Sequence, residues 1–197
     1  MSMVRAGGLR SATKATARGS TAQTTLAFIR QSAGEPALQR ILGRMTPRER
    51  EEVVSTGLMA ELPYQSLYAL WVAADEEFAT ADRDWMVKAG AFAIESVGKR
   101  MYGGLLGKGS PMEFVTQSVS LFRLYYAPGD MVAVQVEAGR AVLRLVGFES
   151  RGVVFCQRQT GGLLKAAELA GGKSVRLQHV RCEHEGDAFC EWEVAWS

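Results

Sequence analysis

The chain has 197 residues, a length that favours one domain able to bury a substantial hydrophobic core. Hydrophobic residues make up 47% and charged residues 22%, which is ordinary for a globular protein, and the net charge of +2 argues against general nucleic-acid binding. No apolar run reaches the roughly 20 residues that a membrane-spanning helix needs.

Residues 1–23 are rich in Ser, Thr, Ala and Gly and carry four basic residues and no acid. This composition predicts a disordered basic tail; the alternative is an arm that contacts an acidic partner or an anionic surface. The segment lacks the apolar core of a secretory signal, so we expect a cytoplasmic protein. Its three cysteines would then be reduced, which favours metal binding over structural disulfides.

Residues 24–197 are expected to form one domain, with helices over 24–63 followed by a core over 64–197. The 3.6-residue period of apolar positions predicts short helices that end at Gly34 and near Gly43. Further helical patterns begin at Pro47 and follow over residues 64–79, 82–101, and from 111 to about 127. The helices at Pro47 and Pro111 each begin with a Ser/Thr-Pro-x-Glu sequence, which has the form of a capping box.

Beyond Gly129 the period changes from 3.6 to 2, which indicates β-strands. Residues 132–136 and 142–146 predict one hairpin, and a helix is expected from about Gln157 to Leu169. A second hairpin over residues 175–196 turns about Gly186. Helices followed by hairpins, without regular βα alternation, predict an α+β fold in which helices pack on an antiparallel sheet of hairpins.

The terminal hairpin gathers residues that bind metals. A turn about Gly186 sets Cys182 opposite Cys190, with β-carbons about 4.5–5.5 Å apart, so the two sulfurs can share a metal ion or form a bridge. His179 lies three residues upstream, and Cys156 supplies a third thiol from another segment.

The combination of Cys156 with Cys182 and Cys190 around a Gly-Asp turn resembles the vinyl reductase domain family. That family belongs to a larger group with TRAPP subunits and haem-nitric-oxide sensors. Its metal-bearing members hold zinc with a Cys at a helix head, an acidic strand residue and two Cys that flank a hairpin turn. The helical half also resembles uncharacterised myxobacterial proteins.

The resemblance implies zinc as a cofactor, held by Cys156, His179, Cys182 and Cys190, with His179 in the place of the acidic ligand. On an ideal strand His179 and Cys182 face opposite sides, so the strand must bulge between them, or else His184 is the fourth ligand. A disulfide between Cys182 and Cys190 is the other alternative.

The resemblance also implies a hydrophobic ligand pocket between helices and sheet, although the same side chains could simply be core. The expected lining residues are Trp71, Phe92, Phe114, Phe122, Tyr125 and Tyr126. The sequence shows no Ser-His-Asp set and no pair of carboxylates. We therefore expect a non-enzymatic ligand-binding or sensory domain with structural zinc, forming a homodimer. The alternative is a protein-interaction adaptor of the same fold whose pocket is filled by side chains.

Overall fold

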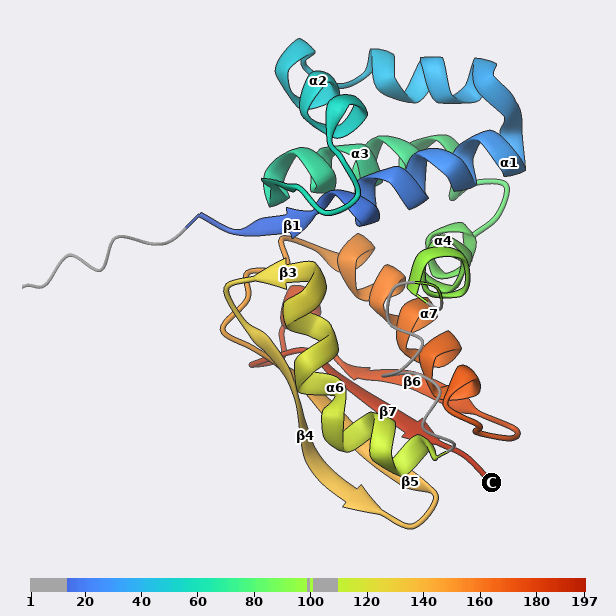
Figure 1. Cartoon of the computed structure of the whole chain (residues 1–197), viewed down its shortest axis with the longest axis vertical. Coiled ribbons are helices and arrows are strands. Elements are labelled where there is room, and N and C mark those ends of the chain that lie inside the picture. The colour runs from blue at the N-terminus through green and yellow to red at the C-terminus, as the bar shows by residue number, and fades with distance from the viewer. Residues whose placement is uncertain (1–13, 99, 101–109) are drawn as a thin grey trace, which may run out of the picture.

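The computed structural model describes residues 14–98, 100 and 110–197. It has an α+β fold, as predicted, with a helical layer formed by the N-terminal half and an antiparallel sheet formed by the C-terminal half (Figure 1). The helical layer contains β1 (Thr16–Arg18), α1 (Gly19–Gly43), α2 (Pro47–Ser55), β2 (Glu61–Pro63) and α3 (Tyr64–Phe78). Within the described part of the chain, no helix is both long and apolar enough to cross a bilayer.

Regular structure begins closer to the N-terminus than the composition predicts. Residues 16–18 form β1, which pairs antiparallel with β2 and with the short β3 (Tyr126–Ala127) in a three-stranded sheet. Helix α1 then begins at Gly19. The predicted disordered tail therefore does not include residues 16–23, and residues 1–13 lie outside the described part. The strand forms because distant segments pair with it, which local composition cannot reveal.

Two predicted helix boundaries have the expected physical cause. Gly34 has φ +79° and ψ 174°, so the backbone leaves helical geometry there and α1 consists of two helical segments. At α2 the Thr46 side chain accepts from the Glu49 backbone N–H, and the Glu49 carboxylate accepts from the Thr46 backbone N–H, which completes the capping box. Ser110, in contrast, makes no side-chain capping hydrogen bond at the start of its helix.

The next helices carry the chain from the helical layer to the sheet. They are α4 (Trp85–Ala93), which continues into the π-helical turn η1 (Ile94–Gly98), and α6 (Pro111–Tyr125). Helix α7 (Val153–Leu169) begins four residues earlier than predicted. Helices α6 and α7 lie across one face of the main sheet (Figure 1).

The main sheet has the strand order β4-β5-β7-β6 and is antiparallel throughout. Its strands are β4 (Asp130–Glu137), β5 (Arg140–Val146), β6 (Arg176–Arg181) and β7 (Glu191–Ala195), and a short 3-10 helix η2 (Glu183–Glu185) joins the last two. The face under the helices is apolar and contains Leu143 and Trp192. The opposite face carries ion pairs such as Arg140 with Glu193, so it is a solvated surface.

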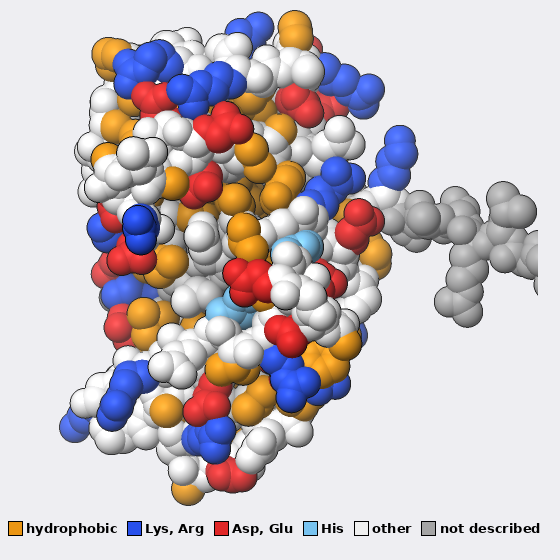
Figure 2. Space-filling model, turned by 180° about the vertical axis from the view of Figure 1, so that it is seen from behind, with side chains coloured by type: hydrophobic (Ala, Val, Ile, Leu, Met, Phe, Trp, Pro, Cys, Tyr) orange, Lys and Arg blue, Asp and Glu red, His pale blue; other side chains and the backbone are white. Residues whose placement is uncertain are grey.

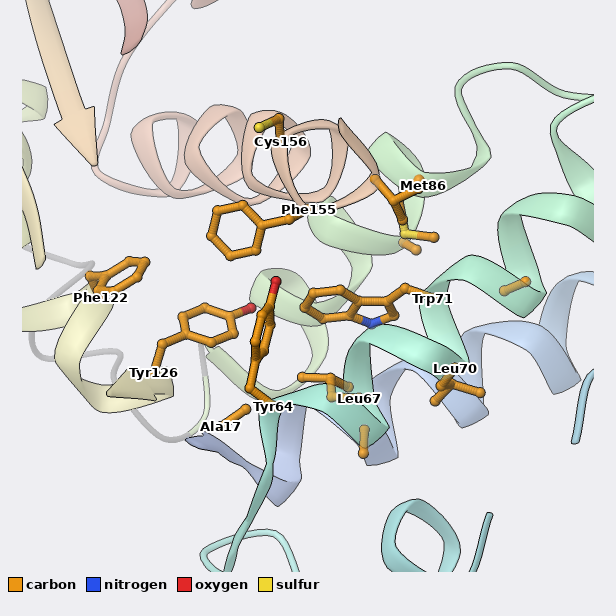
Figure 3. Packing of buried hydrophobic residues seen from close by; sticks show 14 of the residues in the cluster. Ala17, Tyr64, Leu67, Leu70, Trp71, Met86, Phe122, Tyr126, Phe155 and Cys156 are labelled. Carbon is orange, nitrogen blue, oxygen red and sulfur yellow. The ribbon is translucent and has the colours of Figure 1, made fainter. Parts of the chain in front are cut away.

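An aromatic cluster joins the two layers at the centre of the core (Figure 3). The ring of Tyr64 lies 4.8 Å from that of Phe148 and 6.2 Å from those of Tyr126 and Phe155, and Trp71 lies 6.4 Å from Phe155. On α7, Phe155 points into this cluster and Cys156 points away from it (Figure 3). The first turn of α7 therefore contributes Phe155 to the aromatic core on one side and Cys156 to the group of cysteines on the other.

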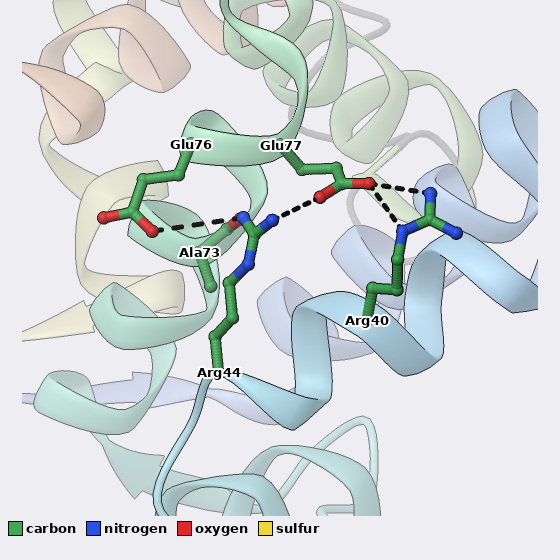
Figure 4. A network of polar contacts seen from close by, with 5 residues as sticks. All are labelled: Arg40, Arg44, Ala73, Glu76 and Glu77. Carbon is green, nitrogen blue, oxygen red and sulfur yellow. Dashed lines mark hydrogen bonds and ion pairs between the residues drawn. The ribbon is translucent and has the colours of Figure 1, made fainter.

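An ion-pair network fixes the second half of α1 against α3 (Figure 4). The Glu77 carboxylate accepts hydrogen bonds from the guanidinium groups of Arg40 at 2.7 Å and Arg44 at 2.6 Å. Arg44 also donates to the Ala73 carbonyl at 3.3 Å. These contacts hold together the helices that follow the break at Gly34.

Candidate functional site

The structure brings three cysteines and one histidine from three segments into one cluster. Cys156 lies in the first turn of α7, Cys182 directly follows β6, and Cys190 directly precedes β7. Gly186, at φ +104°, closes the connection between the last two, as the turn prediction required. The Cys182 backbone N–H donates to the Asp187 carboxylate at 2.8 Å, which stabilises this turn.

A β-bulge places His179 on the same side as the cysteines. His179 pairs with Trp192 and Arg181 pairs with Glu191, so two steps along β6 correspond to one step along β7. This extra residue reverses the alternation, and both His179 and Cys182 face the helices. The predicted bulge is therefore present.

The ligand atoms of Cys156, His179, Cys182 and Cys190 all lie within 4.8 Å of one another. The Sγ atoms of Cys156 and Cys190 are 3.6 Å apart. All three cysteines are free thiols and are buried, so the alternative of a Cys182–Cys190 disulfide does not hold here. Three sulfurs and one imidazole at these separations can surround a single ion.

The thiols polarise one another. The hydrogen bond from Cys156 lowers the pKa of Cys190 to about 4, and His179 also contributes to this lowering. The same hydrogen bond, together with burial, raises the pKa of Cys156, and burial raises the pKa of Cys182. Within this pair the lowered pKa favours the thiolate form of Cys190, and the raised pKa favours the protonated form of Cys156.

His179 makes a side-chain hydrogen bond with Cys190 and also packs against Trp192. Its Nε2 atom is buried and makes no hydrogen bond with any described residue. The ring stacks on the Trp192 indole, with centroids 4.6 Å apart and planes 23° apart. A buried ring nitrogen beside three thiols is a position from which an imidazole can ligate a metal ion.

His184, the alternative fourth ligand, has another partner. Its Nε2 atom lies 2.6 Å from the Ser150 hydroxyl, which also lies 2.5 Å from Glu183 Oε1. In the space-filling view from behind, pale-blue histidine surface appears beside acidic side chains (Figure 2). His184, Glu183 and Cys190 still place ligand atoms within 4.8 Å of one another, so this group adjoins the thiol cluster.

The contact of Ser150, His184 and Glu183 was not expected from the sequence, which predicted no Ser-His-acid set. Its geometry differs from that of a catalytic triad. In a triad the serine and the carboxylate contact different nitrogens of the histidine ring, whereas here both approach Nε2 of His184. Ser150 is also 0% exposed, and its carbonyl accepts from the Tyr64 hydroxyl at 2.7 Å. A substrate cannot reach this hydroxyl in the described conformation.

A second candidate site is an apolar cavity of about 60 Å³ between α6, α7 and η1. Four of the six predicted pocket residues line it: Phe114, Phe122, Tyr125 and Tyr126. The other two do not. Trp71 packs within the aromatic core, and Phe92 packs against Phe28 with ring centroids 5.2 Å apart.

The sequence analysis did not predict the lining residues that η1 and α7 supply, which are Ile94, Gln159, Gly162, Leu163 and Ala166. It also did not predict Leu121 of α6 and Met131 of β4. The available signal was the pair Gly161-Gly162 inside a helical pattern, because adjacent glycines within a helix indicate close approach of another backbone.

No family model matches the sequence, and no curated protein matches it. Solved structures of H-NOX proteins do match the fold. One from K. algicida, in the Fe(II) unliganded state, has a TM-score of 0.70 at 13% identity, over 91% of this chain and 96% of that one. One from S. oneidensis, in the Fe(II)NO ligation state, has a TM-score of 0.71 at 15% identity, over 91% of this chain and 99% of that one.

At these identities the likeness shows the fold alone. It confirms the predicted α+β fold and shows that this fold is like that of H-NOX proteins, whereas membership of the vinyl reductase family stays a prediction. The prediction of zinc as the cofactor is wrong by this comparison. The neighbouring structures are of Fe(II) proteins, and one with a TM-score of 0.62 at 12% identity concerns haem redox potential and porphyrin distortion.

The residues of this chain do not fit haem either. A pocket for a ligand of drug size needs roughly 300 Å³ or more, and the apolar cavity has about 60 Å³. Histidine and cysteine are common axial ligands of haem, yet neither lines the cavity. Both histidines and all three cysteines lie in or beside the thiol cluster instead.

Proposed function

We propose that this chain is a non-enzymatic sensory domain that binds a small apolar molecule in the cavity between α6, α7 and η1. The observation that carries the proposal is the cavity itself: among the described residues its lining is almost entirely apolar, with Gln159 as the one amide side chain. An apolar cavity in a well-packed core loses dispersion contacts, and a ligand restores them.

The size of the cavity restricts the ligand. A cavity of roughly 10–15 Å³ holds one water molecule, and an engineered apolar cavity of about 150 Å³ binds benzene or xenon. A cavity of about 60 Å³ therefore suits an apolar group of roughly four non-hydrogen atoms. The fold similarity to H-NOX proteins, one of them in an Fe(II)NO state, supports a sensory role for small ligands.

Xenon is a suitable probe because it reports on apolar space without requiring any polar contact. We expect xenon pressure to shift the methyl resonances of Leu121, Leu163 and Met131, which line the cavity. Ala166→Leu should abolish these shifts by filling the space. Ala81→Leu, the same substitution at an exposed position, should leave them unchanged. Absence of shifts in the unmodified protein would refute the cavity as a ligand site and favour the adaptor alternative.

We further propose that Cys156, His179, Cys182 and Cys190 form one binding site for a single thiophilic metal ion. Convergence of the four donor atoms within 4.8 Å and the unpaired Nε2 of His179 support it. Such an ion would join the start of α7 to both strands of the terminal hairpin. A set of four protein ligands leaves no coordination position for substrate, so the ion's role would be structural.

Cobalt(II) is a direct probe of this second proposal, because thiolate ligation gives it a strong charge-transfer absorption. We expect one cobalt ion per chain, with loss of the band in Cys190→Ser and in His179→Gln. His184→Gln, which removes the other imidazole, should retain the band. Elemental analysis of protein purified from cells would identify the native ion. Equal effects of the two histidine substitutions would contradict the ligand set.

Self-association into a homodimer is part of the proposal and rests on the resemblance alone. Sedimentation equilibrium of the full chain distinguishes a monomer from a dimer. A monomer at all concentrations would refute the dimer without affecting either site.

A further inference from the structure

The three thiols of the cysteine cluster are shielded from solvent, so a metal ion needs a route to them. Cys156, Cys182 and Cys190 are each at most 2% exposed. A hydrated cation exchanges its water for protein donors as it enters such a site, and a metal site therefore requires an entry path. Suitable donors for the first exchange lie in the connection between β6 and β7.

That connection carries a second group of metal-binding side chains, and this group reaches the surface. Glu183 and His184 are exposed residues of η2. Their ligand atoms lie within 4.8 Å of each other and of the Cys190 sulfur. Carboxylate, imidazole and thiolate are all ligands of divalent metal ions, so the three side chains can hold one ion together.

Cys190 belongs to both groups of ligands. Its sulfur also lies within 4.8 Å of the ligand atoms of the other three members of the buried cluster. An ion on Cys190 can therefore change from one group to the other without losing that bond. Cys182, which directly precedes Glu183 in the chain, is a member of the buried group, so the two groups are also adjacent along the backbone.

The charge of this connection favours a cation. Residues 182–190 contain three acidic residues and no Lys or Arg. Arg144 and Arg181 lie over the ring of Phe189, but both form ion pairs with Glu191. Figure 2 shows histidine surface beside acidic side chains on one face of the molecule. A concentration of negative charge raises the local concentration of cations and their rate of association.

Ser150 holds the exposed group in position. Its hydroxyl oxygen lies 2.6 Å from His184 Nε2 and 2.5 Å from Glu183 Oε1, and its carbonyl accepts a hydrogen bond from the buried Tyr64 hydroxyl. The hydroxyl is neutral and leaves the charge of the Glu183 carboxylate uncompensated. A cation between the carboxylate and the imidazole adds that compensation.

We propose that Glu183, His184 and Cys190 form a transfer site, at which a divalent metal ion from solvent binds first and from which it passes to the buried four-ligand site. The ion stays on the Cys190 sulfur while the buried ligands replace Glu183 and His184. This inference rests on the proposed metal site and adds the route by which that site is filled. The transfer site holds the ion only in passage, so one ion per chain remains the final state.

The rate of cobalt(II) uptake tests this route, because the thiolate charge-transfer band grows as the ion reaches the cysteines. We expect His184→Gln and Glu183→Gln to slow growth of the band about tenfold in stopped-flow mixing with the full chain. Release into excess EDTA should slow by the same factor, since entry and exit follow one path. The final band and the Kd should then be unchanged.

Glu185→Gln is the matched control. It removes the same charge from the same short helix, but Glu185 is not a member of the transfer site. Its uptake rate should stay close to that of the unmodified protein. If Glu185→Gln slows uptake as much as Glu183→Gln does, general electrostatic attraction explains the effect and the transfer site is refuted.

The remaining outcomes separate this inference from the proposed metal site. Unchanged uptake rates in both transfer-site variants overturn the transfer site while the buried site stands. A lower affinity with faster release overturns it as well, because the residues would then stabilise the final complex. Absence of a cobalt band in the unmodified protein refutes the buried site and the transfer site together. Glu183→Gln preserves side-chain size, so it gives the decisive rates if His184→Gln does not fold.

Discussion

Gly161 on α7 faces the backbone carbonyl of Val87 on α4 so closely that a β-carbon at Gly161 would lie 1.8 Å from the Val87 oxygen. Gly90 on α4 makes the reciprocal approach, with its β-carbon position 2.0 Å from the Arg158 carbonyl oxygen. Backbones meet here without intervening side chains. This contact fixes the position of α7, which carries both Arg158 and Cys156.

Gly161→Ala should therefore destabilise the protein by about 1–3 kcal/mol, because the new methyl group forces α4 and α7 apart. Gly162→Ala is the matched control, since its β-carbon would lie 3.6 Å from Ile94 and 3.8 Å from the Gly90 oxygen, which are ordinary contacts. Alanine is a better helix former than glycine, so this variant should gain up to about 1 kcal/mol. Urea unfolding measures both, and similar free energies for the two variants would contradict the close approach.

The parts of the fold that sequence reasoning predicted have local causes. The capping box at Thr46 and the Gly186 turn are each defined within a few residues. The convergence of Cys182 with Cys190 follows from one turn between two alternating strands. For this reason the proximity of Cys182 to Cys190 was predictable without knowledge of the helical packing.

The parts that sequence reasoning did not predict depend on distant neighbours. Strand β1 is three residues long and has no periodicity to detect; it exists because β2 and β3 pair with it. Arg158 reads as a surface residue of a helix, yet α7 turns it toward Trp71 and Thr24. Trp71 and Phe92 pack against other apolar side chains, but they do not line the cavity as predicted. An apolar residue type does not distinguish a cavity wall from a filled core.

The Trp192 indole donates a hydrogen bond to the Thr160 hydroxyl at 2.9 Å, and Thr160 donates in turn to the Cys156 carbonyl at 2.9 Å. Thr160→Val removes the acceptor and leaves a buried indole N–H without a partner, so we expect a loss of about 1–3 kcal/mol in the free energy of unfolding.

Thr116→Val serves as the control. Thr116 bonds the carbonyl four residues earlier in the same way, but its side chain is exposed. Denaturant unfolding should show a change within about 0.5 kcal/mol for that control. Comparable losses would refute the role of the indole contact.

Glu77 predicts a pH dependence of stability. Hydrogen bonds from Arg40, followed by the charges of Arg40 and Arg44, lower the pKa of Glu77 below its ordinary 4.5. As the pH falls, the Glu77 carboxylate therefore becomes protonated at a higher pH in the unfolded chain than in the folded chain. The resulting stabilisation is complete above the unfolded pKa and is lost as pH falls through the folded one.

Glu77→Gln should accordingly lower the melting temperature at pH 7, and its difference from the unmodified protein should shrink as pH decreases below about 4. Glu51→Gln is a suitable control, since Glu51 is an exposed glutamate without an ion pair among the described residues. Thermal melts across pH 3–7 measure the difference. A difference that persists undiminished at pH 3 would show that the Arg40–Glu77–Arg44 network does not act through the ionised carboxylate.

Tyr64 links the aromatic core to the segment that precedes α7. Its buried hydroxyl donates to the Ser150 carbonyl at 2.7 Å, and the Ser150 hydroxyl contacts both Glu183 and His184. Tyr64→Phe leaves this buried carbonyl without its partner, so we expect a loss of about 1–2 kcal/mol in stability. Tyr68→Phe is the matched control, because the half-buried Tyr68 hydroxyl makes no hydrogen bond with a described residue.

Hydrogen exchange separates a local effect of this contact from a general one. If Tyr64 holds the segment that leads into α7, its loss should increase exchange at residues 150–156 and in η2 more than in α1. That pattern would place Tyr64 in support of the cysteine cluster, since Cys156 lies at the end of the same segment. Uniformly faster exchange throughout the chain would instead mean that the hydroxyl contributes only to global stability.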